Sequence, residues 1–306
     1  MTRVSTGSNY SIMTSNLMRA QLRQNVLGEQ VASQKVANDL KGYSKNAEVL
    51  TAMRSAQAKI EGLIDQTKLV ANRLDMQDTG IGQVAGGIQS GRAAIENAMA
   101  AGGATLMQQL EAAFGNVTQG VNTKSNGRYV FAGALTDTAP TTAKTLADLT
   151  AAPTTADLFK NDNYIATNRI DQQTTVQTGV LGDALGTKAF DAFKQVQAYV
   201  EANGPFGSPL TSTQHDFLKG MVATFKAAHT DALNTQGKNG LVQKRFETAG
   251  VELKDQADTP TGMVGGIVDV DMAEAVTRLE AAQMAVQAAA QVFSSLQSSS
   301  LLNVLK

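Results

Sequence analysis

Residues 50–99 read LTAMRSAQAKIEGLIDQTKLVANRLDMQDTGIGQVAGGIQSGRAAIENAM. Positions in alternating steps of three and four residues form one stripe here, and most are apolar: Leu50, Met53, Gln57, Ile60, Ile64, Thr67, Ala71, Leu74, Asp78, Ile81, Ala85, Ile88, Arg92, Ile95 and Met99. Such a heptad stripe predicts one long helix that packs along its whole length, as in a coiled coil. At 1.5 Å per residue the helix extends for about 75 Å.

Glycines interrupt this stripe and follow it. Gly80, Gly82, Gly86 and Gly87 lie within the stripe, and no strand precedes them and no Gly-Lys-Ser/Thr follows. A phosphate-binding loop is therefore excluded, and helix flexibility or close helix packing is expected instead. The pair at 102–103 is expected to end the helix. The apolar pattern then restarts at Leu106, Leu110, Phe114, Val117 and Val121.

Both chain ends carry the same spacing. The N-terminal stripe is Met13, Leu17, Ala20, Gln24, Leu27 and Val31, and the C-terminal stripe is Met272, Val276, Leu279, Gln283, Val286, Ala290, Phe293, Gln297, Leu301 and Val304. Since neither end can bury its stripe alone, the two ends are expected to bury each other. Their net charges, about +5 over residues 1–60 and about −2 over residues 261–306, favour this pairing weakly. The predicted assembly seam consists of Met13, Leu17, Leu27, Val31, Met272, Val276, Leu279, Val286, Phe293 and Leu301.

The prolines separate the middle of the chain from the ends. All five lie at Pro140, Pro153, Pro205, Pro209 and Pro260, so long helices are expected outside residues 140–260. Short β-prone runs begin at Tyr129, Tyr164 and Thr174. Residues 136–155 resemble an exposed loop, and helices are expected over residues 188–201 and over residues 213–256, the latter interrupted near Gly237 and Gly240.

These patterns predict a mainly α fold. It is a long antiparallel coiled coil or helical bundle built from both chain ends, with a smaller β-rich domain inserted. Residues 1–45 and 268–306 would form the terminal inner coiled coil. Residues 46–128 and 213–267 would form a helical bundle, and residues 129–212 the β-rich outer domain.

Composition argues against several kinds of function. The net charge is −1, aromatic residues make up 5 %, and Trp and Cys are absent, so thiolate chemistry is excluded and neither nucleic acid nor a membrane is expected as a partner. No apolar run spans a membrane, and residues 1–10 lack an apolar signal segment. His215 and His229 are too far apart on a helix to share a metal ion. Asp271 and Glu274 have the spacing of a helix cap rather than of a cation site. We therefore expect no enzyme activity, metal or cofactor.

The ends and two internal segments resemble one known family. Residues 267–279, IVDVDMAEAVTRL, and residues 300–305, SLLNVL, resemble the C-terminal signature of bacterial flagellins and of the hook–filament junction protein, hook-associated protein 3. The start RVST at residues 3–6 and the segment NGRYVFAG at residues 126–133 are similar to the junction family. Residues 239–247 are similar to the family's return helix. Residues 33–44 lack the proline turn of many relatives, so the resemblance leaves that turn open.

The resemblance implies a secreted structural subunit of the extracellular bacterial flagellum. It implies type III export without cleavage, an export chaperone, and terminal helices that order when subunits assemble. The implied partners are further copies of the chain and neighbouring flagellin and hook-associated subunits. A junction role in swimming motility is favoured. The alternatives are a filament-forming flagellin with a short outer domain, and a flagellin-like surface protein whose middle domain binds a glycan or host ligand.

Overall fold

The computed structural model describes residues 3–171 and 173–302. Most of these residues are helical, and the strands form two small two-stranded sheets, which confirms the predicted mainly α fold with a β-containing insert. Contacts divide the chain into two compact units. Unit 1 comprises residues 1–59 and 256–306, and unit 2 comprises residues 60–255. The three-part division expected from the sequence stays a prediction.

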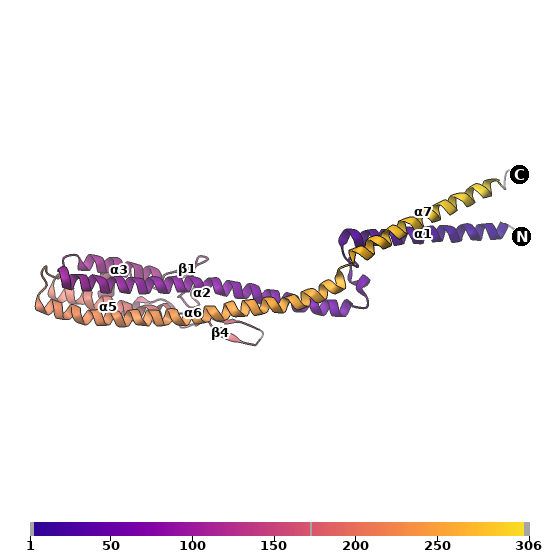
Figure 1. Ribbon diagram of the computed structural model, residues 1–306. Helices are drawn as coiled ribbons and strands as arrows, with labels where there is room; N and C mark the ends of the chain where they lie inside the picture. Colours follow the sequence, from indigo (N-terminus) through magenta and orange to yellow (C-terminus); the bar gives the residue numbers. More distant parts are fainter. Residues whose placement is uncertain (1–2, 172, 303–306) are drawn as a thin grey trace. The chain divides into compact units, whose positions relative to one another are not determined.

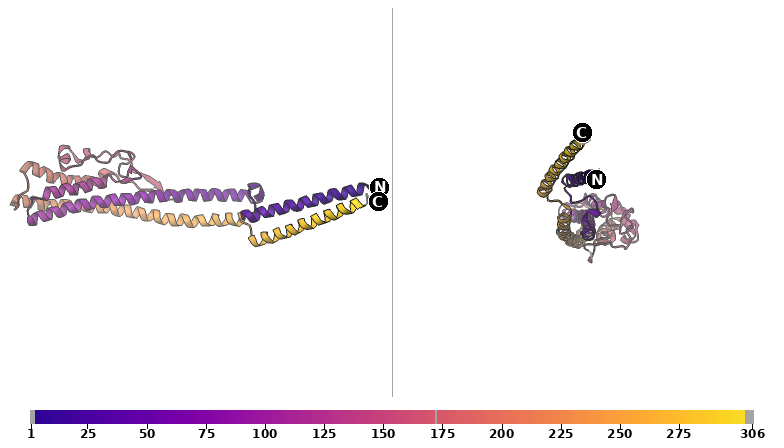
Figure 2. Two further views of the ribbon diagram at one scale, coloured as in Figure 1. Left: turned by 90° about the horizontal axis from the view of Figure 1, so that it is seen from above. Right: turned by 90° about the vertical axis from the view of Figure 1, so that its right-hand side faces the viewer.

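Unit 1 is built from both ends of the chain. It contains α1 (Arg3–Ser33), the short 3₁₀ helix η1 (Leu40–Tyr43) and α7 (Met272–Leu302). It also contains the first residues of α2 (Ala47–Ala101) and the last residues of α6 (Ser212–Val268). Helices α1 and α7 lie side by side and antiparallel in both views (Figures 1 and 2). The expected pairing of the two ends is therefore present within one chain.

The segment that follows α1 is joined to the segment that precedes α7. The amide of Val36 donates to the carbonyl of Val268 at 2.8 Å, and the amide of Val270 donates to the carbonyl of Gln34 at 3.1 Å. Tyr43 is buried, and its hydroxyl donates to the carbonyl of Ala37. These contacts fix the turn that the family resemblance left open.

Unit 2 is a bundle of α2, α3 (Leu106–Val121), α5 (Gly182–Asn203) and α6 around a large apolar core, with a smaller apolar cluster between α2, α6 and the β3–β4 region. Phenylalanine rings fill its centre. Phe114 lies 5.1 Å from Phe190 and 5.5 Å from Phe193, between ring centroids, and Phe193 lies 4.9 Å from Phe225. Every stripe position from Leu50 to Met99 is buried or half-buried, and α2 ends just before Gly102 as expected.

Close approach between α2 and α3 explains part of the glycine content. A Cβ atom on Gly87 would lie 2.7 Å from Cγ2 of Val117 and 2.8 Å from the carbonyl oxygen of Ala113. A Cβ atom on Gly120 would lie 2.7 Å from the carbonyl oxygen of Gly80. Of the two expectations for these glycines, close packing therefore holds at Gly80 and Gly87.

The insert contains short elements packed on the bundle. Its strands are β1 (Lys124–Ser125) with β2 (Arg128–Tyr129), and β3 (Thr167–Arg169) with β4 (Thr175–Gln177), both pairs antiparallel. Residues 136–155 differ from the expected exposed loop, because they contain α4 (Leu146–Ala151) and bury Leu146 and Leu149. The 3₁₀ helix η2 (Thr155–Leu158) follows.

Helix α6 is longer than expected. It continues through Gly237 and Gly240, where an interruption was expected, and through Pro260, which is buried. A proline inside a helix removes one hydrogen bond and costs about 3 kcal/mol. Packing of the surrounding residues therefore outweighs local propensity here.

Candidate assembly surface

The α1 side of the predicted seam faces α7. Met13, Leu17, Leu27 and Val31 are all half-buried, as are Ala20 and Gln24 between them. At the far end of the pair the ring of Tyr10 lies 5.0 Å from that of Phe293, between centroids. Among the described side chains of α1 none is fully buried, so this pairing is shallow.

Within one chain, α7 packs on α1 through a different register from the predicted stripe, and the predicted assembly seam between subunits stays a prediction. The positions withdrawn from solvent are Ala275, Leu279, Ala282, Val286, Ala289 and Phe293, again in steps of four and three. The predicted residues Leu279, Val286 and Phe293 belong to this stripe. Met272 and Val276 are instead exposed, and the side chain of Leu301 lies outside the described residues. Small alanines at alternate positions replace the predicted Val276 and Gln283, and small side chains let two helices approach closely.

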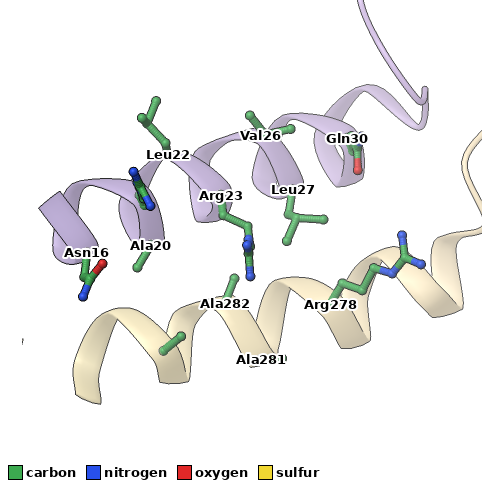
Figure 3. A pocket seen from close by; sticks show the side chains of 12 residues that line it. Asn16, Ala20, Leu22, Arg23, Val26, Leu27, Gln30, Arg278, Ala281 and Ala282 are labelled. Carbon is green, nitrogen blue, oxygen red and sulfur yellow. The ribbon is translucent and has the colours of Figure 1, made fainter. Parts of the chain in front are cut away.

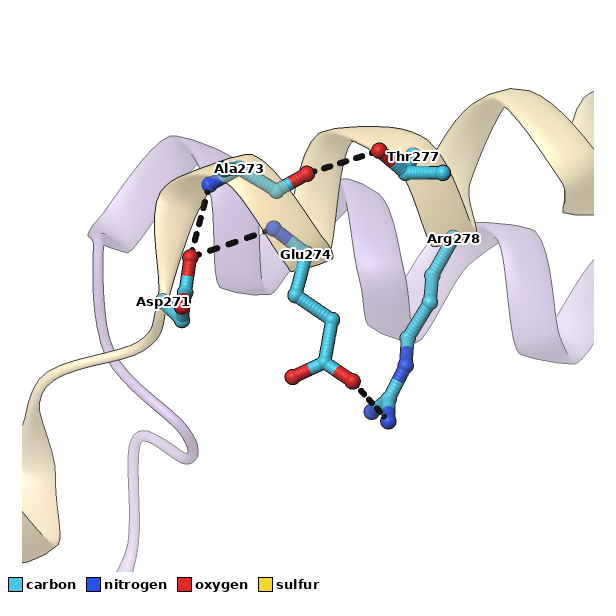
Figure 4. A network of polar contacts seen from close by, with 5 residues as sticks. All are labelled: Asp271, Ala273, Glu274, Thr277 and Arg278. Atoms are coloured by element: carbon cyan, nitrogen blue, oxygen red, sulfur yellow. Dashed lines mark hydrogen bonds and ion pairs between the residues drawn. The ribbon is translucent and has the colours of Figure 1, made fainter.

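Asp271 begins α7. Its Oδ1 atom accepts hydrogen bonds from the amides of Ala273 at 2.9 Å and Glu274 at 3.1 Å (Figure 4). The expected helix cap is therefore present. Glu274 does not reach back to the cap but forms an ion pair with Arg278 one turn later, at 2.5 Å.

A second apolar stripe lies on the opposite side of α1. Its members are Ile12, Met18, Leu22 and Val26, which we call the outer stripe; Leu22 is 64 % exposed and Met18 59 %. Leu22 and Val26 point away from α7, whereas Arg23 and Leu27 point toward it (Figure 3). A helix that is apolar on two faces is normally buried on both. The outer stripe is therefore a surface without a partner among the described residues of this chain.

Between the outer stripe and α7 lies an open groove of about 900 Å³. Its lining is mainly apolar and carries three arginines, Arg19, Arg23 and Arg278, and no acid. Arg278 is neutralised by Glu274, whereas Arg19 and Arg23 form no ion pair within the described residues. The groove can thus hold apolar groups beside a negative charge.

Sequence reasoning missed the outer stripe although its signal was present. Met18, Leu22 and Val26 are four residues apart, which places them on one helix face. The predicted N-terminal stripe, from Met13 to Val31, has the longer and more regular heptad pattern, so it was interpreted as the packing face of the helix. The outer stripe is recognisable only once the position of α7 is known.

The fold does not bring the other candidate site residues together. His215 is exposed in the first turn of α6, and His229 is half-buried further along the helix. Within residues 3–171 and 173–302, His, Cys, Asp and Glu side chains form no group of three that could hold a metal ion. No helix in that part of the chain has both the length and the apolar character needed to cross a membrane.

Paired terminal helices, a helical bundle and a small insert define this chain as a mainly α protein, in which the outer stripe of α1 has no partner among the described residues. Residues 222–305 match the family described as the bacterial flagellin C-terminal helical region. This match confirms the resemblance to flagellins that the C-terminal stretch predicted. No curated protein matches the chain.

Two solved structures share the fold. A protein assigned as a flagellar hook-associated protein from Vibrio parahaemolyticus is 11 % identical, with a TM-score of 0.59 over 72 % of this chain and 97 % of that one. FlgL from Bacillus cereus is 16 % identical, with a TM-score of 0.54 over 70 % of this chain and 99 % of that one. At 11 % and 16 % sequence identity, these two likenesses show a shared fold alone.

Proposed function

We propose that this chain is a structural subunit of the extracellular bacterial flagellum, with no enzyme activity, and that it joins hook to filament. The outer stripe carries the proposal. Four large apolar side chains on α1 face solvent although the same helix already packs on α7. Burying an exposed Leu or Val side chain stabilises a contact by about 1.5–3 kcal/mol. Burial of the outer stripe, repeated between subunits, is therefore sufficient to drive assembly.

The names of the two structural relatives, a hook-associated protein and FlgL, favour the junction role. The flagellin C-terminal region favours the second candidate, a filament-forming flagellin with a short outer domain. In either role the partners are further copies of this chain and neighbouring flagellar subunits. Export by the type III route with a chaperone is part of the same proposal.

Immunogold electron microscopy of intact cells, with an antibody against residues 136–212, tests the proposal. A single spot where hook meets filament supports the junction role. Label along the filament makes the chain a flagellin. Label on the cell envelope alone overturns the assembly proposal and favours a surface ligand-binding protein.

A further inference from the structure

Unit 2 carries a second surface, centred on Leu69 of α2, that no other described part of the chain covers. Leu69 is 66 % exposed and lies at the edge of a pocket of about 440 Å³. The pocket is lined by Leu69, Arg73, Ser125, Asn126, Arg128, Tyr129, Val130 and Thr136, which together with Lys124 we call the Leu69 patch.

The Leu69 patch is positively charged. Arg73 is half-buried, and its Nη2 atom donates only a long hydrogen bond, 3.4 Å, to the carbonyl of Val130. Burial lowers the pKa of Arg73, which expresses the cost of keeping a guanidinium there without a carboxylate. Lys124 places its Nζ atom 4.4 Å from the ring centroid of Tyr129. Within the described residues Arg73, Arg128 and Lys124 form no ion pair, so the patch has positive charge to offer a partner.

Acids near the patch do not cancel this charge. Asp65, one turn before Leu69, pairs with Lys68 at 3.4 Å. Asp137 follows Thr136 in the chain but does not line the pocket. The Leu69 patch therefore consists of an apolar centre surrounded by basic side chains.

The β1–β2 hairpin holds the patch in a fixed form. Ser125 pairs with Arg128 across a two-residue turn whose members, Asn126 and Gly127, have φ angles of 50° and 81°. Asn-Gly with two positive φ angles matches the twist of a hairpin. The patch is thus preformed, which lowers the entropic cost of binding.

A surface of opposite character lies on α6. Val251 is 62 % exposed and has Glu247 one turn before it, Glu252 beside it and Asp255 one turn after it. We call these four residues the Val251 patch. Glu247 pairs with Lys244 at 3.2 Å, whereas Glu252 and Asp255 form no ion pair within the described residues. Lys254, three residues after Val251, is exposed as well and offsets one of these two acids, so the Val251 patch keeps a net negative charge whereas the Leu69 patch is positive.

The two patches lie at the same level of unit 2 but on different sides. A Cβ atom on Gly250 would lie 3.6 Å from Cγ2 of Thr67, so α2 and α6 are in contact at this level. Leu69 lies two residues beyond Thr67 and Val251 one beyond Gly250, an offset along the helices of about 5 Å. Two residues turn a helix by about 200°, so Leu69 faces away from the contact with α6.

We propose that the Leu69 patch of one copy binds the Val251 patch of a second copy, side by side. This inference rests on the proposed self-assembly and names a contact for it in unit 2. Because the two patches differ, the contact is head-to-tail and repeats from copy to copy. Its small axial offset places neighbours at one level, as in a ring or a shallow helical layer.

The absence of cysteine from the sequence allows a direct test. Leu69→Cys and Val251→Cys are introduced into separate full-length chains, which are mixed under assembly conditions and oxidised. The expected product is the mixed disulfide dimer. Leu241→Cys is the matched control for Val251→Cys, because Leu241 is 69 % exposed on the same helix but lies ten residues away. The mixed dimer is expected in at least about fivefold excess over the control pair, which corresponds to about 1 kcal/mol of preference.

Charge exchange tests the electrostatic part. Arg128→Glu in the Leu69→Cys chain leaves the half-buried Arg73 in place and is expected to lower the yield about fivefold. Glu252→Arg in the Val251→Cys chain is expected to restore it, because the swap re-creates opposite charges. Loss without rescue contradicts the pairing of these two patches.

Sedimentation of the wild-type chain separates the two possible failures. If the wild type assembles but Val251→Cys and Leu241→Cys give equal yields, or Leu69→Cys mainly joins to itself or to another protein, only this inference is overturned. If the wild type stays monomeric and no mixed dimer forms, the proposed self-assembly fails as well.

Discussion

Gly86 and Gly87 are neighbours in the sequence but have different surroundings. A Cβ atom on Gly86 meets nothing within 4 Å, whereas one on Gly87 meets α3 side-chain and backbone atoms at 2.7–3.0 Å. Backbone atoms cannot move aside cheaply, so the two positions respond differently to the same added methyl group.

We therefore expect opposite effects from two single substitutions. Gly87→Ala should lower the free energy of unfolding by about 1–3 kcal/mol, because it overpacks the α2–α3 contact. Gly86→Ala should raise it by up to about 1 kcal/mol, because alanine is the better helix former. Urea denaturation of the full chain measures both. Equal effects at the two positions would contradict the close-packing explanation.

A carboxylate in the insert makes stability depend on pH. Oδ2 of Asp148 accepts hydrogen bonds from the amides of Lys144 at 2.8 Å and Thr145 at 2.9 Å, at the start of α4. These backbone hydrogen bonds hold the pKa of Asp148 below its ordinary value. A carboxylate with a lowered pKa in the folded state stabilises the fold above the unfolded pKa, about 3.9, and this contribution is lost as the pH falls through the folded value.

The variant Asp148→Asn should therefore be less stable than the wild type at pH 7. The difference should narrow as the pH falls below about 4, where the wild-type carboxylate becomes protonated. Urea denaturation of both proteins at pH 7 and pH 3 checks this. The other carboxylates are common to both proteins and cancel in the comparison, so a gap that widens at low pH contradicts the assignment.

At the scale of elements, the terminal pair is less firmly packed than the bundle. On α7 only Ala275 and Ala282 are buried among the described side chains, whereas α3 buries a complete stripe that includes Phe114. Regions with few buried apolar contacts open at lower free energy and are cut first by proteases.

We expect limited proteolysis of the purified monomer to cut within residues 10–33 and 272–295 before it cuts unit 2. Assembly should protect the same segments, since it covers the outer stripe. Mass spectrometry of the fragments over time locates the cuts. Residues 106–121 of α3 serve as the internal reference, and equal resistance of α1 and α3 in the monomer would contradict this prediction.

Long-period patterns were predictable from the sequence, and features set by neighbouring elements were not. The fifteen-position stripe of α2 fixed a helix face because its period is sustained over many turns. The register of α7 was missed because hydrophobicity ranks Val276 above Ala275, whereas the packing with α1 selects the smaller side chain. Likewise, nothing local to Pro260 indicates that α6 continues through it.

At the scale of the whole molecule, the proposed function depends on the outer stripe of α1. Packing within the described part of one chain does not explain why these side chains are apolar, because they face solvent. Exposed large apolar side chains on one helix face mark interaction surfaces. An assembly contact repeated in every subunit multiplies the effect of a single substitution on polymer stability.

The double variant Leu22→Gln/Val26→Gln tests this dependence, because glutamine removes apolar surface from the stripe while it favours the helix. Each position should lose about 1.5–3 kcal/mol of burial per contact, so the concentration needed for assembly should rise at least about tenfold. Sedimentation measures that concentration, and circular dichroism verifies that helix content is kept. The matched control is Leu241→Gln, which exchanges an equally exposed leucine in unit 2 and should leave assembly unchanged. Cells that carry only the double variant should swim poorly, and normal assembly of the double variant would mean that α1 meets its neighbours through another face.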